Sequence, residues 1–249
     1  MINIDSVYQN VLALANKEQR GYITPQEFNL FARQAQMEIF EQYFYDINQW
    51  SRQHGNSHEY GDILTNLEEK ISGFEIYDSA GLAITSSTGD VSLGGLADIY
   101  RLGTVKVTYT SQGETQYYIA EQVQGNELVK YQKSPLAKPS FKRPCYVLLS
   151  SGSGGNLAMK VYPNPDVTDI VSVDYVKKPL NPAWGYVVVT GKALHDPNPS
   201  KTTHFELHKS EEVELIYKIL KLAGVTIQRD DLAKAGQNME AAMVQQEKQ

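Results

Sequence analysis

Apolar residues recur with two different periods along this chain, and the period changes near residue 74. Residues 6–17, 24–48 and 62–71 place apolar side chains three and four positions apart, which predicts amphipathic helices. From residue 74 to 207 the apolar runs are short, rich in β-branched and aromatic residues, and bounded by Gly, Ser and Pro, which is typical of strands and turns. Helical spacing returns at about residue 210.

This order of elements predicts an α+β fold. We expect both chain ends to pack together as one helical bundle, formed by residues 1–73 and 208–249. Residues 74–207 would then project from the bundle as a large antiparallel β insertion. No internal repeat and no low-complexity tract interrupts this organisation.

The long helix beginning near residue 24 carries the clearest start signals in the sequence. Thr24 is a natural N-cap, Pro25 suits the first helical position, and Glu27 completes a capping box. Ile23 and Phe28 can form the hydrophobic staple across this start. Because neither Gly nor Pro follows before residue 48, the helix could extend for about 37 Å.

The apolar surface of this helix is wider than one core-facing stripe. A helix with such a surface is buried on more than one side, either by its own chain or by another subunit. We assign five residues near its end to an oligomer interface: Phe40, Tyr43, Phe44, Ile47 and Trp50.

The other helices have weaker boundaries. Asp5 is expected to cap a first helix, Ser210 to cap the helix after the β insertion, and Gly224 to end it. Residues 226–249 favour a helix with only a thin apolar stripe, which would be marginal alone in water. We expect that stripe to dock on a partner through Leu232, Met239 and Met243.

Several strands stand out within the β insertion. TVKVTYT and QYYIAEQV flank the turn SQGET and predict a hairpin, and residues 146–149 predict an apolar strand. LAMKVYP and DIVSVDYVKKP alternate well enough to be paired strands, with Lys177, Lys178 and Pro179 protecting a sheet edge. The glycine cluster at residues 150–155 lacks the Lys-Ser/Thr ending of a phosphate-binding loop, so a hairpin loop is preferred.

Composition narrows the class of protein. Of 249 residues, 41% are hydrophobic and 21% are charged, which is ordinary for a globular chain. No run of about 18 apolar residues occurs, so no membrane span or membrane partner is expected. The start of the chain lacks a signal-peptide profile, and the single Cys145 suits a reducing compartment. The net charge of −6 argues against wrapping nucleic acid.

Three segments carry partial metal-ligand patterns. Residues 16–27 match much of an EF-hand loop, with Glu27 at its last position, but Arg20 occupies a ligand position and the capping box already explains Glu27. A calcium-binding interaction module therefore remains a lesser alternative. His54 and His58, and likewise His204 and His208, lack the further ligands that would complete a site.

No catalytic motif is present in the sequence. We therefore expect a protein that is not an enzyme and uses no cofactor or metal. A virion hydrolase would need clustered carboxylates, whereas pairs such as Glu68-Glu69 fit solvated helix faces.

The layout resembles head-to-tail adaptor (connector ring) proteins of tailed bacteriophages. The resemblance covers most of the chain and rests on TPQEFNLF with EIFEQYFY in the long helix, then KVYPNP, VDYVKKP and EEVELIYKIL. It implies a homo-oligomeric ring, commonly dodecameric, in the neck of a virion assembled in the host cytoplasm. The ring would join the portal to a tail or nozzle protein and surround the DNA channel without sequence-specific binding.

The resemblance also places residues 226–249 along the portal. Known adaptors are often smaller and more purely helical than this chain. Another neck or tail ring protein, or a structural protein associated with the tail tube, therefore remains an alternative.

Overall fold

The computed structural model describes residues 1–15, 23–50, 63–79, 82–85, 88–96, 98–150, 157–198 and 200–226. The chain divides into two compact units, which we call the helical unit (Met1–Gly73 with Pro179–Gln249) and the β unit (Phe74–Lys178). The mixture of helices with one large sheet is an α+β fold, as the sequence predicted. The second boundary lies at Lys178, so residues 179–207 belong to the helical unit rather than to the β insertion.

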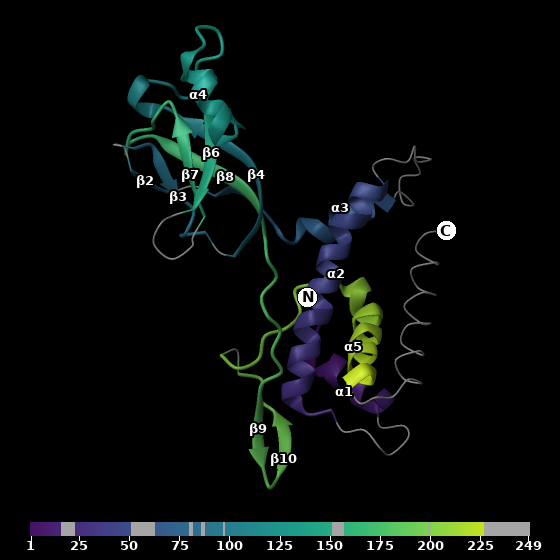
Figure 1. Ribbon diagram of the computed structural model, residues 1–249. Helices are drawn as coiled ribbons and strands as arrows, with labels where there is room; N and C mark the ends of the chain where they lie inside the picture. The colour runs from purple at the N-terminus through teal and green to yellow at the C-terminus, as the bar shows by residue number, and fades with distance from the viewer. Residues whose placement is uncertain are drawn as a thin grey trace. The chain divides into compact units, whose positions relative to one another are not determined.

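The helical unit contains α1 (Ile4–Ala15), α2 (Pro25–Trp50), α3 (Ile63–Ser72) and α5 (Glu212–Thr226), preceded by a 3-10 turn at Lys209–Glu211. Helix α2 packs against α5 and α3, and α1 packs against α5 (Figure 1). Residues 179–207 return through this unit and form the two-stranded ribbon β9 (Tyr186–Val189) and β10 (Lys192–His195).

Helix α2 begins where its capping signals predicted. The Thr24 amide donates to Glu27 Oε2 at 2.9 Å, and the Glu27 amide donates to Thr24 Oγ1 at 3.3 Å, which is a reciprocal capping box. Ile23 and Phe28 are both buried on either side of this cap. The first turn therefore satisfies its own amides, and packing of the apolar face holds the rest of the helix.

Three other helix boundaries were wrong. Helix α1 begins at Ile4, so Asp5 lies within the helix and does not cap it. The backbone amide of Asp5 donates instead to the side-chain Oδ1 of Asn3. Helix α5 follows a 3-10 turn that begins after His208, whose ring accepts from the Ser210 amide. It continues past Gly224 to Thr226, because this glycine is buried and keeps a helical backbone.

The β unit is one eight-stranded sheet in the order β1-β8-β4-β5-β6-β7-β3-β2. All neighbouring strands are antiparallel except the parallel pair of β5 and β6. Figure 1 shows the sheet curling on itself, which lets one face close over a core that includes Tyr109, Met159 and Val173. The strands are β1 (Glu75–Ser79), β2 (Ala83–Thr85), β3 (Asp90–Ser92), β4 (Ile99–Thr108), β5 (Tyr118–Gln122), β6 (Cys145–Ser150), β7 (Leu157–Tyr162) and β8 (Ile170–Lys177).

The predicted hairpin of β4 and β5 is confirmed, with Val105 opposite Ala120. The predicted pairing of β7 with β8 was wrong, because β7 lies between β6 and β3 whereas β8 lies between β1 and β4. Strand β8 is therefore internal, and Lys177 does not protect a sheet edge. A helix that the sequence did not predict, α4 (Gly125–Lys133), connects β5 towards β6.

The run WGYVVVTGKAL contains β9 and all but the last residue of β10, the two strands of the ribbon. Thr190 and Gly191 both have positive φ, 52° and 77°, and they join two strands in which Val189 pairs with Lys192. Two central residues of positive φ are typical of the type I′ turn, which matches the twist of a two-residue hairpin.

Three features of the sequence lie outside the described residues: most of the calcium-like loop (16–22), the loop with His54 and His58, and the glycine cluster after its first residue (151–155). Among the helices that the structure does describe, none combines the length and apolarity that crossing a membrane requires.

Candidate functional site

The ribbon β9–β10 is anchored at its base by Trp184, which is only 2% exposed. The Trp184 indole Nε1–H donates to Asp5 Oδ1 at 2.9 Å, and its ring lies 4.2 Å from the ring of Tyr8. Tyr186 stacks on the same indole at 5.9 Å, and Gln26 Nε2 donates to the Tyr186 hydroxyl. The base of the ribbon is therefore fixed to α1 and α2.

Two amide side chains of α2 hold the returning segment by its backbone. The Trp184 amide donates to Asn29 Oδ1 at 2.7 Å, and Asn29 Nδ2 donates to the Trp184 carbonyl at 3.3 Å. Two turns along, Gln36 Nε2 donates to the Leu180 carbonyl at 2.7 Å. Gln36 is 1% exposed, and its Oε1 accepts from the Glu206 amide. These amides replace the strand partners that this irregular segment lacks.

Beyond its base, the ribbon exposes apolar side chains on both faces. Val187, Val188 and Val189 are 44%, 62% and 50% exposed, and Leu194 is 53% exposed. Successive side chains of a strand point to opposite faces, so neither face of the ribbon is covered along these positions. A two-stranded ribbon is marginal alone in water, and exposed apolar ribbons mark interaction surfaces.

Of the five predicted interface residues of α2, two are buried within the helical unit and three are half-buried. Phe40 and Tyr43 are 0% and 4% exposed, so their apolar surface is already used within the unit. The Phe40 ring packs edge-on against Phe44 at 5.1 Å, and Phe44, Ile47 and Trp50 are half-buried. Leu30 and Tyr45, which the interface prediction omitted, are the large exposed apolar residues of α2, at 63% and 67%.

The predicted portal-docking residues Leu232, Met239 and Met243 lie outside the described residues. The structure therefore gives no geometry for that contact.

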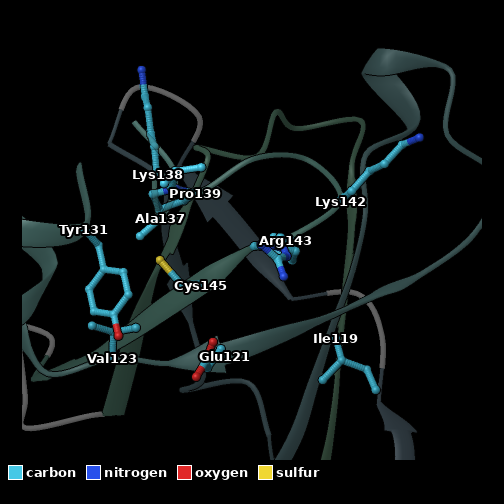
Figure 2. A pocket seen from close by; sticks show the side chains of 12 residues that line it. Ile119, Glu121, Val123, Tyr131, Ala137, Lys138, Pro139, Lys142, Arg143 and Cys145 are labelled. Carbon is cyan, nitrogen blue, oxygen red and sulfur yellow. The ribbon is translucent and has the colours of Figure 1, made fainter. Parts of the chain in front are cut away.

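The β unit carries a groove with a cavity of about 300 Å³ between β5, the start of β6 and the loop that follows α4. Figure 2 shows it from close by. Its apolar lining includes Ile119, Val123 and Leu136, and its charged rim includes Lys138, Lys142 and Arg143. Sequence reasoning missed this groove, although residues 130–143 hold five Lys and Arg and no Asp or Glu.

Cys145 lines the groove but has no arrangement for nucleophilic chemistry. Burial, and then the charge of Glu121, raises the pKa of the Cys145 thiol above its usual range. A reactive thiol needs the opposite shift, produced by a nearby cation or a helix N-terminus. Cys145 is instead a small buried residue at the start of β6.

A cluster of buried charges lies in the helical unit. Lys70 Nζ is 2.6 Å from Glu211 Oε1, and Glu211 is 2% exposed. Lys218 and Glu214, one turn apart on α5, form a second buried pair at 3.4 Å. Each of these four charges lies beside an opposite one, which lowers the cost of burying it.

Metal ligation finds little support in the part of the chain that the structure describes. No group of three or more His, Cys, Asp or Glu side chains is close enough there to hold a metal ion. Glu27, the last position of the calcium-like loop, accepts from both the amide and the hydroxyl of Thr24. These bonds, led by the side-chain bond, lower the pKa of Glu27.

Comparison with known proteins gives no family: neither the protein-family models nor the curated proteins contain a match to this sequence.

Proposed function

We propose that this chain is a structural protein of a tailed-bacteriophage virion. In this proposal it forms a homo-oligomeric ring in the neck, joins the portal to the tail, and surrounds the channel through which DNA passes. It acts by assembly rather than by catalysis.

The observation that carries the proposal is the exposed apolar ribbon β9–β10. Val188 and Leu194 are 62% and 53% exposed along the ribbon, while its base is held by the buried Trp184. A surface that is both apolar and rigidly anchored loses little conformational freedom when a partner covers it. The ribbon is therefore suited to a permanent contact, such as one between ring subunits.

The resemblance in sequence layout adds the phage context. KVYPNP and VDYVKKP occupy β7 and β8 with their flanking turns, and EEVELIYKIL begins at the 3-10 turn and continues into α5. The net charge of −6 suits a channel wall that must not hold DNA, because an acidic wall repels phosphates. Residues 226–249 supply the portal contact in this proposal.

The size of the β unit favours a second candidate function within the same class of virion structural proteins. An eight-stranded unit is large for an adaptor, so another ring of the neck or tail is the alternative assignment. Binding to purified portal protein, compared with binding to purified tail protein, separates the two. Deletion of residues 226–249 should abolish portal binding and leave the far-ultraviolet circular dichroism of the folded remainder unchanged.

The ribbon is tested by polar substitution. We expect sedimentation velocity to show a concentration-dependent oligomer for the wild-type chain. Val188→Thr with Val189→Thr should weaken that self-association, because threonine keeps the shape and strand propensity of valine but loses its apolar surface.

The matched control is Val167→Thr with Val213→Thr, two valines exposed at 72% and 45% elsewhere on the chain. It should leave self-association unchanged. A wild-type chain that remains monomeric at all concentrations and ignores portal protein would contradict the proposal.

A further inference from the structure

The groove of the β unit is cationic and apolar at once. We define the cationic groove as the cavity with the rim residues Lys138, Lys142 and Arg143 and the apolar residues Ile119, Val123 and Leu136; Glu121 also lines it, so three cations face one carboxylate there. Leu136 is 92% exposed and Ile119 is 64% exposed, so the apolar lining is open to solvent. The β unit has ten basic and ten acidic residues, so the five cations of residues 130–143 are a local concentration of charge within a neutral unit.

Helix α4 beside the groove lacks a covering of its own. This nine-residue helix contains no buried residue, and Val129 and Tyr131 are 52% and 38% exposed. A helix this short is marginal in water without tertiary packing. An uncovered short helix next to an open apolar cavity indicates a surface that a partner completes.

The shape of the rim distinguishes among anionic partners. Figure 2 shows Lys138 and Lys142 diverging from the rim, so the cations do not converge on one point as a site for a small anion requires. Tyr131 lines the groove and is 38% exposed, whereas the ring of Phe141 packs edge-on against Tyr109 at 5.0 Å, so a single open ring is offered where stacking on successive bases needs several. The exposed aliphatic residues favour a polypeptide with both carboxylates and large apolar side chains.

The exposed face of α2 has this complementary composition. Residues Leu30, Glu38, Glu41 and Tyr45 follow helical spacing along one stripe, opposite the buried stripe that contains Phe28 and Ile39. We call the first set the acidic stripe; Glu27 extends it by one turn, and no Lys or Arg lies within it. Its ends are Leu30 and Tyr45, which are 63% and 67% exposed.

The net charge of the helical unit is also opposite in sign to the charge of the groove. The unit holds 13 Lys and Arg against 19 Asp and Glu, and so carries the entire net charge of −6. The neutral β unit with its cationic groove and the acidic helical unit are thus complementary surfaces of one chain.

We propose that the cationic groove binds the acidic stripe of a second copy of this chain. The contact joins two different surfaces, so it is heterologous, and repeating it from copy to copy closes a ring when the rotation between copies allows. The groove takes one large apolar side chain of the stripe, while its rim pairs with Glu38 and Glu41. This inference rests on the proposed ring and names the surfaces that would form it.

Charge reversal tests the contact in the full chain. Lys138→Glu, Lys142→Glu and Arg143→Glu together should weaken self-association at least about tenfold, because like charges then face each other across the contact. The control reverses three exposed cations elsewhere, Arg101, Lys178 and Lys209, and imposes the same change in net charge. We expect it to assemble as the wild type does. Leu136→Asp is a second variant, at a residue too exposed to affect folding.

Rescue makes the test specific. Glu38→Lys with Glu41→Lys should also prevent assembly, and combining it with the three groove reversals in one chain should restore assembly, because the charges are then exchanged. Carboxylate-to-lysine cross-links in a mixture of ¹⁵N-labelled and unlabelled wild-type chains should connect Lys138 or Lys142 to Glu38 or Glu41 of a differently labelled chain.

The outcomes separate the two proposals. If the wild type assembles and the groove variants assemble equally well, the groove contact is wrong while the ring remains. If the groove variants lose assembly but the exchanged chain does not recover it, or if the cross-links form only within one chain, the acidic stripe is the wrong partner. A wild-type chain that never self-associates contradicts both.

Discussion

Asn29 of α2 pairs with the backbone of Trp184 through both ends of its side-chain amide. Its Oδ1 accepts from the Trp184 amide at 2.7 Å, and its Nδ2 donates to the Trp184 carbonyl at 3.3 Å. One polar side chain thus imitates a strand partner, 155 residues away in the sequence. The pairing fixes the base of the apolar ribbon to the helical unit.

Replacing Asn29 with alanine should therefore destabilise the helical unit. The Trp184 amide and carbonyl would lose their partners in a partly buried place, at a cost of about 1–3 kcal/mol. Urea unfolding followed by circular dichroism at 222 nm measures this change in free energy. The control is Arg33→Ala, an exposed position one turn along the same helix, which should change stability by less than about 0.5 kcal/mol. Equal stability of the two variants would show that the Asn29 pairing contributes nothing.

Interactions between residues that are close together in the chain could be predicted from the sequence, and interactions between distant residues could not. The start of α2 was correct because Thr24 and Glu27 bond to each other three residues apart. The pairing of β7 was missed because its partners are set by the whole sheet, and alternating apolar residues do not identify a neighbour.

The base of the ribbon was missed for a related reason. Gln36 lies among the buried residues Ala32, Ala35 and Ile39, and a polar residue there signals a bond whose partner the sequence does not name. The turn at Thr190 and Gly191 had a readable signal, a Gly within an otherwise strand-like run. The cationic groove was also readable as charge, since residues 130–143 lack any acid.

The capping box of α2 should make stability depend on pH. Bonds from Thr24 lower the pKa of Glu27, so its carboxylate stabilises the folded state above the usual Glu pKa of about 4.3 and loses this effect as pH falls through its lower folded value. Glu27→Ala should be less stable than the wild type near neutral pH, by up to about 1 kcal/mol at this exposed site.

That difference should shrink below about pH 4, because both folded and unfolded Glu27 become protonated. Chemical unfolding of both proteins from pH 3 to 7 tests it. A gap that stays constant across this range would contradict the role of the Glu27 charge.

Removing only one partner of the Lys70–Glu211 ion pair should lower the free energy of unfolding. Lys70→Met leaves the 2%-exposed Glu211 without its cation, which costs about 3–5 kcal/mol for a buried pair. Adding Glu211→Leu should recover much of that loss, because the uncompensated charge is then removed. Urea unfolding of the single and double variants measures both values. A single variant as stable as the wild type would show that solvent already screens the pair.

Cys145 should be unreactive in the folded protein. Burial raises the pKa of its thiol, so less thiolate is present at a given pH, and the side chain is only 6% exposed. Labelling with a thiol-specific disulfide reagent at pH 8 should be at least about tenfold slower in buffer than in denaturant. Equal rates would indicate that the groove opens far enough to expose β6.

The central claim is that this chain functions as one subunit of a ring. Electron microscopy of the full-length chain, alone and mixed with a phage portal protein, tests it most directly. The account predicts closed rings, coaxial with the portal in the mixture and absent when the groove residues Lys138, Lys142 and Arg143 carry reversed charge. Isolated single copies in both samples, with the portal unoccupied, would contradict it.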